Sequence, residues 1–429
     1  MKKFLILAAL SAVLLSCGGN REQILKVYNW SDYIDETVLT DFEEWYKAQT
    51  GEDITVVYQT FDVNETMLSK IEKGHEDYDV VCPSDYIIER MLNDGLILPL
   101  DFASIPDEIN YIALNRSPFM QQLFHDINPS IDANDYSVPY MWGTTGIIYN
   151  TEEVTAEEAS TWDVIRNPKF SGQILIKDAP RDVYGPVLIY LKQKELNEGT
   201  VTLDDLMRDS SDESIAAVEN YLRQVKDGVL GWEADFGKDQ MTKGRGVISL
   251  NWSGDAVWAR DEAAEVGVSL DYIVPEEGST VWFDGWVIPK YAKNIKAATY
   301  FIDFMCRPDI AIRNMEETGY VSANGAIEVL ESQIDEEMDP IDVSYFFPGA
   351  DSVCVDPVLY PDKAVIERCA LEHDWGKDTD KLLAMWSRVK GDNASSLTYV
   401  VIVLALLAII AAVLFSNKSK KRRRKSHKK

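Results

Sequence analysis

The chain has 429 residues, with 42 Lys and Arg against 71 Asp and Glu, for a formal net charge of −29 at pH 7. Two lysines lie in residues 1–17 and nine basic residues in 416–429, so the body between them holds 31 basic against 71 acidic residues. A negative field of this size repels nucleic acid and concentrates small cations. We therefore expect no nucleic-acid partner.

Residues 1–17 have the pattern of a bacterial signal peptide. Two lysines precede an apolar run that ends in Leu-Leu-Ser-Cys-Gly, with the cysteine at Cys17. This ending resembles a lipobox, in which the cysteine is lipidated and becomes the mature N-terminus. The alternative is an ordinary signal peptide with an incidental cysteine. We predict a lipid anchor on Cys17.

Near the other end, residues 397–415 form an uncharged run of 19 residues. At about 1.5 Å per residue, a helix of this length crosses a hydrocarbon core of roughly 30 Å. The segment 416–429 that follows has nine positive charges and no negative charge, and such segments stay on the cytoplasmic side. The sequence thus predicts a C-terminal transmembrane helix and a basic cytoplasmic tail; the alternative for the tail is a nuclear-type or nucleic-acid-binding segment.

Between the two ends, short β-rich runs alternate with helical patterns. The expected strands are 24–30, 54–58, 78–82, 173–176 and 247–252. An amphipathic helix is expected over 38–49, ended by Gly51, and a further helix over 256–265. This alternation predicts an α/β fold. The cysteines outside the signal peptide leave a disulfide between Cys354 and Cys369 open.

Three tryptophans are each followed two or three positions later by an aspartate. The pairs are Trp30 with Asp32, Trp252 with Asp255 and Trp282 with Asp284. An aromatic face attracts a positive charge, and a carboxylate accepts ammonium protons in charge-assisted hydrogen bonds. Trp30 and Trp252 end predicted strands and their aspartates follow, at the edge where open α/β sheets bind ligands. The pairs predict a site for an organic cation; as alternatives, Asp32 and Asp255 could cap a turn or helix, and Asp284 could occupy a turn.

Six segments resemble the periplasmic spermidine/putrescine-binding proteins of polyamine ABC transporters. They read VYNWSDYI, YDVVCPSDYIIERM, VPYMWGTTGIIYN, NWSGDAVWAR, VWFDGWVIPKYAKN and FMCRPDIAIRNMEETGYVSANGA. The resemblance extends from Val27 to about Met385. It implies an α/β, two-lobed periplasmic-binding-protein fold of type II with hinge crossings near 140–148 and 281–287. Lobe 1 is expected over 24–137 and 283–329, and lobe 2 over 138–282 and 330–390.

The resemblance also implies which residues bind the ligand. Aromatic walls and hydrogen-bonding groups would come from Trp30, Tyr33, Ser84, Tyr86, Trp252, Trp282 and Tyr320, and the ammonium ligands would be Asp32, Asp255 and Asp284. Looser matches point to Asp178, Asp182 and Glu372. Arg181 would repel an ammonium unless it points away or pairs with an acid. We expect no cofactor and no metal.

The sequence therefore predicts an extracytoplasmic receptor in the periplasm or cell envelope, anchored to the inner membrane. It would close over a polyamine and deliver it to an ABC permease and ATPase. Alternatives are a membrane-tethered amine sensor, or a binder of another small organic cation or a sugar on the same fold. Catalysis is disfavoured for two reasons. The sequence has no G-x-S-x-G nucleophile motif, no H-E-x-x-H zinc-hydrolase motif and no P-loop motif, and it has only four histidines. Whether putrescine or spermidine is preferred stays open.

Overall fold

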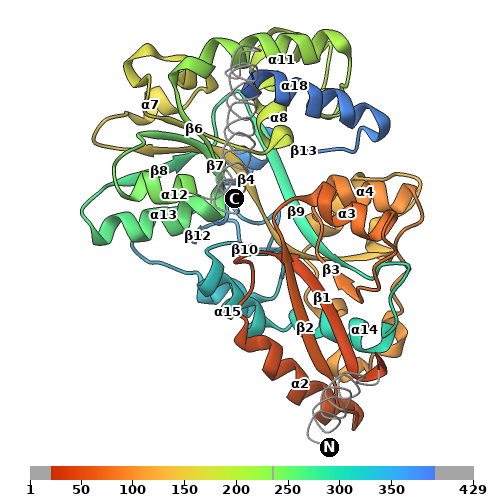
Figure 1. Cartoon of the computed structure of the whole chain (residues 1–429). Coiled ribbons are helices and arrows are strands. Elements are labelled where there is room, and N and C mark those ends of the chain that lie inside the picture. Colours follow the sequence, from red (N-terminus) through yellow and green to blue (C-terminus); the bar gives the residue numbers. More distant parts are fainter. Residues whose placement is uncertain (1–20, 234–235, 392–429) are drawn as a thin grey trace, which may run out of the picture.

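A computed structural model describes residues 21–233 and 236–391 of the chain (Figure 1). The predicted signal peptide with Cys17, the apolar run 397–415 and the tail 416–429 lie outside the described residues.

Eleven of the described strands form one mixed sheet, whose main path has the order β2-β1-β3-β9-β4-β7-β5-β6. The described strands are β1 (Ile24–Trp30), β2 (Thr55–Phe61), β3 (Val80–Val81), β4 (Ser137–Asn150), β5 (Ile174–Lys177), β6 (Val229–Glu233), β7 (Ile248–Trp252), β8 (Leu270–Ile273), β9 (Ser279–Val287), β10 (Val321–Ser322), β11 (Pro340–Ile341), β12 (Val353–Cys354) and β13 (Cys369–Leu371). Of these, β11 and β12 form a separate two-stranded sheet. The predicted strands are therefore present, with ends shifted by a few residues.

Two long antiparallel strands connect the halves of this sheet. Residues 137–144 of β4 pair with β9, whereas residues 145–150 pair with β7 and β8. Figure 1 shows β4 and β9 running from the group of helices around β1–β3 to the group around β5–β8. Each half has its own apolar core, so the described chain forms two lobes. The predicted hinge segments 140–148 and 281–287 fall within β4 and β9.

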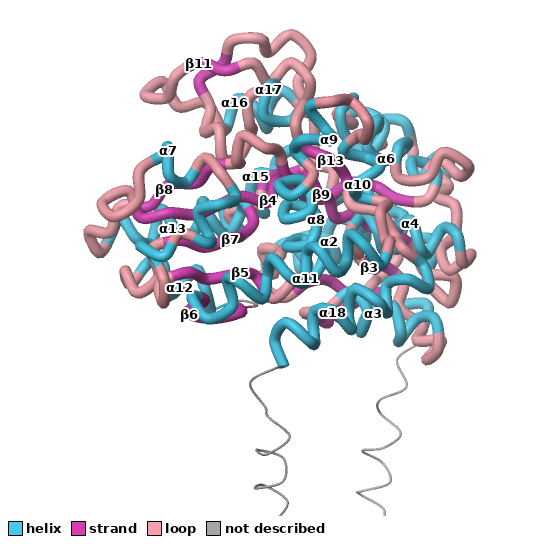
Figure 2. Tube along the Cα trace, turned by 90° about the horizontal axis from the view of Figure 1, so that it is seen from above, coloured by secondary structure: helices cyan, strands magenta, loops and turns pink. Residues whose placement is uncertain are grey.

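Helices cover both halves of the sheet, as the view from above in Figure 2 shows. They are α2 (Thr37–Thr50), α3 (Asn64–Glu72), α4 (Asp85–Asn93), α5 (Tyr111–Leu114), α6 (Pro118–Asp126), α7 (Ala156–Ala159), α8 (Pro180–Leu191), α9 (Gln193–Asn197), α10 (Leu203–Met207), α11 (Asp212–Val225), α12 (Phe236–Thr242), α13 (Ser253–Glu265), α14 (Ile295–Met305), α15 (Pro308–Thr318), α16 (Ile327–Ser332), α17 (Lys363–Ile366) and α18 (Thr379–Gly391).

The first βαβ unit shows how local sequence sets these elements. Helix α2 buries Val38, Phe42 and Tyr46, which recur every four residues on one face. It ends at Gly51, whose φ of 75° lies in the left-handed region and whose N–H donates to the Lys47 carbonyl. β1 then pairs in parallel with β2. The helix predicted over 38–49 and its glycine end are thus observed.

The structure corrects one sequence expectation and answers one question that the sequence left open. The fold was expected to include a C-terminal transmembrane helix, but none of the helices within 21–233 and 236–391 is long and apolar enough to cross a membrane. That part of the predicted fold class is therefore wrong for the fold that the structure describes. In addition, Cys354 and Cys369 are both free thiols, so the structure does not form the disulfide that the sequence left open.

Candidate ligand-binding site

Asp284, from β9, lies at the meeting point of three distant segments. Its carboxylate accepts hydrogen bonds from the hydroxyls of Ser84 (2.6 Å) and Tyr33 (2.7 Å). Ser84 precedes α4, and its hydroxyl binds Asp284 instead of capping that helix. Asp284 is 5% exposed. Burial, together with the nearby charge of Asp182, raises the pKa of Asp284 to about 6, despite the two hydroxyl donors.

Three further carboxyls gather beside Asp284, on α4, α8 and the segment after β13. They are Asp85, Asp182 and Glu372, and the charges of Asp85 and Asp182 each raise the pKa of Glu372. Burial raises the pKa of Asp182 to about 6, and raises the pKa values of Asp85 and Glu372 strongly. Oδ2 of Asp85 and Oε1 of Glu372 are buried without a hydrogen-bond partner among the described residues. The acid cluster of Asp85, Asp182, Asp284 and Glu372 therefore has unused acceptors.

Aromatic rings form a continuous wall from Asp284 toward β7. The ring of Tyr33 contacts that of Tyr320 at 5.1 Å between centroids, Tyr320 contacts Trp282 at 5.8 Å, and Trp282 contacts Trp252 at 6.4 Å. Gly254 leaves room for this wall, because a Cβ there would lie 2.3 Å from the Tyr320 ring. The wall ends at Asp182, whose Oδ1 accepts the indole N–H of Trp252 at 2.7 Å.

Asp255 lies at the same end of the aromatic wall but already has partners. Lys177 donates to its Oδ2 at 2.7 Å, and the Tyr320 hydroxyl donates to its Oδ1 at 2.9 Å. Burial acts to raise the pKa of Asp255, but the charges of Lys177 and Lys238 and the hydrogen bonds from Lys177 and Tyr320 together lower it. Helix α13 begins at Ser253 with Trp252 as its N-cap, so Asp255 lies in the first turn and does not cap the helix.

Arg181 lies between aromatic rings rather than against a carboxylate. Its guanidinium carbon is 4.5 Å from the ring centre of Tyr86 and 5.1 Å from that of Trp375, and it donates to the His373 carbonyl. Arg181 thus covers one face of the Tyr86 ring. The hydroxyl of Tyr86 accepts from Asn64 at 3.1 Å. Arg181 still lowers the pKa of Glu372, although burial dominates.

Trp30, Asp32 and Asp178 are the remaining residues that the sequence predicted for the site. Trp30 is half-buried and packs on Phe61 at 4.6 Å between centroids. Asp32 is exposed in a turn with a positive φ of 52°. Asp178 is bound by α18, because it accepts the Trp386 indole N–H at 2.7 Å and pairs with Lys390. The structure therefore does not bring Asp32 and Asp178 into the acid cluster.

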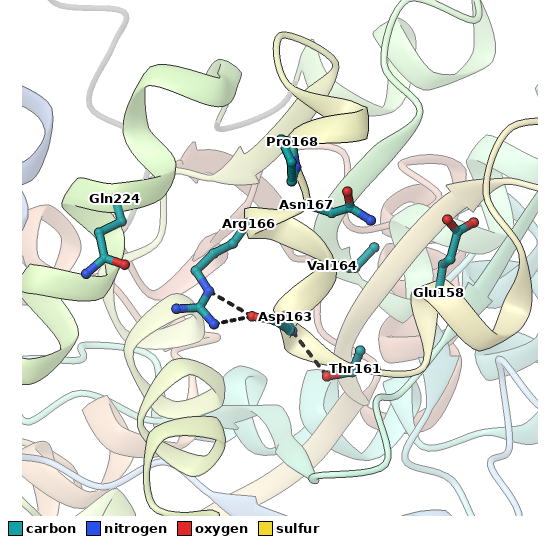
Figure 3. A pocket seen from close by; sticks show the side chains of 8 residues that line it. All are labelled: Glu158, Thr161, Asp163, Val164, Arg166, Asn167, Pro168 and Gln224. Carbon is teal, nitrogen blue, oxygen red and sulfur yellow. Dashed lines mark hydrogen bonds and ion pairs between the residues drawn. The ribbon is translucent and has the colours of Figure 1, made fainter.

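A cavity much larger than the one at the acid cluster lies elsewhere in the described part of the molecule. This cavity has a volume of about 550 Å³. Figure 3 shows the side chains that line it, which are Glu158, Thr161, Asp163, Val164, Arg166, Asn167, Pro168 and Gln224. Arg166 and Asp163 pair with each other there. By contrast, a cavity of only about 10 Å³ touches Arg181 and Glu372. Chemistry rather than volume thus singles out the acid cluster.

The fold and this geometry agree with known proteins. Residues 39–336 match the family of bacterial extracellular solute-binding proteins. The chain belongs to this family. It is 31% identical to the putrescine-binding periplasmic protein PotF of Escherichia coli (strain K12), over 76% of this chain and 85% of that protein. It is 29% identical to the spermidine/putrescine-binding periplasmic protein of the same organism, over 88% and 95%.

Solved structures support the same assignment for this solute-binding protein. The spermidine/putrescine ABC transporter substrate-binding protein PotD from Streptococcus pneumoniae has a TM-score of 0.63 at 30% identity, covering 86% of this chain and 98% of that one. The predicted family and the two-lobed α/β fold are thereby confirmed. The family is one of solute-binding proteins and not of enzymes.

Two charged residues of this solute-binding protein's site were not selected from the sequence. Asp85 stands between two selected residues, Ser84 and Tyr86, and its place after a predicted strand could have indicated it. Lys177 ends a strand that otherwise reads as buried, with the sequence ILIK. A lysine at the last position of such a run is a signal of a buried ion pair, because an isolated ammonium is too costly to bury.

Proposed function

We propose that this protein is an extracytoplasmic polyamine receptor that delivers its ligand to the permease of an ABC transporter. The observation that carries the proposal is the acid cluster, in which two buried carboxylate oxygens lack donors. A buried acceptor without a donor costs free energy, and an ammonium group brings three donors and an opposite charge. The aromatic wall beside the cluster suits the methylenes between two ammonium groups.

The named relatives support the ligand class. PotF is named for putrescine, and PotD for spermidine and putrescine and for an ABC transporter. Both are periplasmic or transporter-linked binding proteins by name. A net charge of −29 attracts small cations.

Closure of the two lobes over the amine is part of this proposal. Asp85 and Glu89 come from α4, whereas Asp182 and Glu372 come from the other side of the β4–β9 crossing. Nδ1 of His373 lies 3.1 Å from Oε2 of Glu89, and the Asp374 N–H donates to the same oxygen. These contacts support a hinge that brings both sides of the acid cluster together. The lobe limits at 24–137, 283–329, 138–282 and 330–390 stay a prediction.

Calorimetric titration of the full-length chain with putrescine, spermidine, spermine and maltose tests the function. We expect micromolar or tighter binding of at least one amine and no heat from maltose. Small-angle scattering of the same samples should show a smaller radius of gyration with amine than without it. Absence of binding to all three amines would overturn the proposed ligand class, and binding of maltose would favour a sugar receptor.

We also propose that a lipid on Cys17 anchors the receptor to the inner membrane, on its periplasmic side. The Leu-Leu-Ser-Cys-Gly sequence supports this proposal. Mass spectrometry of the protein isolated from membranes should find an N-terminal diacylglyceryl cysteine. The modification and the membrane association should both be lost in Cys17→Ser. A Cys17→Ser protein that stays in the membrane fraction would contradict the lipid as the necessary anchor.

A further inference from the structure

Lys177 makes the contacts that a bound amine would make. It is the last residue of β5 and is 1% exposed. Its Nζ lies 4.1 Å from the centre of the Trp252 ring, 2.7 Å from Oδ2 of Asp255 and 3.6 Å from Oε1 of Glu233. An ammonium over an aromatic face and against a carboxylate is the arrangement expected of an organic-cation subsite. Here the chain itself supplies the ammonium.

This subsite adjoins the ligand cleft and shares its walls. Tyr320 donates to Asp255, and its ring contacts that of Tyr33, which donates to Asp284. Trp252 covers the Lys177 ammonium with its ring and donates its indole N–H to Asp182. A chain of methylenes that follows the aromatic wall away from Asp284 therefore leads to Asp255.

The acid cluster and the Asp255 subsite differ in their bound cations. The acid cluster has four carboxyls; Arg181 lowers the pKa values of Asp85, Asp182 and Glu372, and Lys177 also lowers that of Asp182, although burial outweighs both. Asp255, in contrast, is in direct contact with Lys177 at 2.7 Å and has Lys238 at 4.0 Å. A third ligand ammonium arriving at Asp255 would meet a like charge in a buried setting, which is strongly unfavourable.

We infer that Lys177 is a built-in occupant of the ammonium subsite formed by Trp252 and Asp255, so that the cleft selects a diamine over a triamine. This inference rests on the proposed polyamine function. The two ammonium groups of a diamine are taken by Asp284 and by the carboxyls of Asp182 and Glu372. The third ammonium of a triamine must lie beside Lys177 or outside the aromatic wall. In either place it adds no favourable contact with the protein.

Replacing Lys177 by Met tests this inference. Met keeps most of the side-chain volume and removes the charge, which leaves Asp255 and Glu233 to receive a ligand ammonium. In titrations of the full-length wild-type chain, putrescine should bind more tightly than spermidine. In Lys177→Met, the ratio of spermidine to putrescine affinity should rise by at least about tenfold, since a gained charge pair in a buried site is commonly worth that much.

Two further variants make the test specific. In the double variant Lys177→Met with Asp255→Asn, the gain for spermidine should be much smaller than in Lys177→Met, because the nearer carboxylate is removed and only Glu233, 3.6 Å from the Lys177 ammonium in the wild type, remains to receive a ligand ammonium. Lys296→Met is the matched control: it removes a lysine of an exposed pair with Glu52, at 2.8 Å and far along the chain on α14. The affinity ratio in Lys296→Met should equal that of the wild type.

The outcomes separate this inference from the proposed function. If the wild type binds amines but Lys177→Met keeps the wild-type ratio, the role of Lys177 is overturned and the receptor function stands. If the wild type binds no amine, the proposed function itself fails. If Lys177→Met folds only in the presence of amine, its melting temperature is measured with each amine instead. Spermidine should then raise the melting temperature of the variant more than putrescine does, and a larger increase with putrescine overturns the inference.

Discussion

Replacement of Asp284 by Asn is expected to lower the affinity for the preferred amine by at least about 100-fold. The variant keeps the size of the side chain and can still bond to Ser84 and Tyr33, but it removes the negative charge that these hydroxyls orient. Truncating one side of a buried, hydrogen-bonded charge pair commonly costs about 2–5 kcal/mol, and 1.4 kcal/mol is tenfold in affinity. Calorimetric titration with the amine measures the loss.

Asp303→Asn is the matched control for this variant. Asp303, on α14, is fully buried like Asp284, accepts the Ile112 N–H at 3.0 Å and has a pKa raised by burial to about 7. It lies outside the acid cluster, so its replacement should change protein stability but leave the amine affinity within about twofold of the wild type. An equal loss of affinity in both variants would show that Asp284 acts through folding and not through the ligand.

Amine binding is expected to weaken by up to about 100-fold between pH 7 and pH 5. The pKa values of Asp182 and Asp284 are raised to about 6, so at pH 5 each carboxyl is ionised about one time in ten. The ligand ammonium groups stay charged over this range, because alkylamines titrate near pH 10. Each carboxyl that must lose a proton on binding therefore lowers the amine affinity at pH 5 by about tenfold. Titrations at pH 5, 6 and 7 measure the slope, and a pH-independent affinity would exclude both carboxyls as ammonium ligands.

The same carboxyls make the stability of the ligand-free protein depend on pH in the opposite direction to its amine affinity. Because their pKa values in the folded protein lie above the usual value near 4, the folded state binds protons that the unfolded state has released. Their contribution to stability is fully present below about pH 4 and is lost as the pH rises through about 6. The melting temperature of the free protein should thus gain from acidification toward pH 5, and this gain should be smaller in Asp284→Asn. A gain of equal size in both proteins would contradict the raised pKa of Asp284.

The sequence by itself determined the elements and the family. Strand and helix patterns are local, because apolar spacing and a glycine such as Gly51 act within a few residues. The helix predicted over 38–49 is therefore found at 37–50, and each predicted strand is recovered. The segments around Trp30, Trp252 and Asp284 were sufficient to indicate the polyamine-binding family, which the comparisons confirm.

The tertiary structure alone decided which charges meet. Strand β5 lies beside β7, with Ile176 opposite Leu250, and this pairing brings Lys177 next to Asp255, 78 residues away. Helix α18 takes Asp178 out of the cleft. The partner of a buried charge depends on which elements become neighbours, and no local pattern records that choice. The sequence therefore indicated that acids and aromatic rings would form a cation site, whereas the structure showed which acids gather with unpartnered oxygens and which already have a cation of the chain beside them.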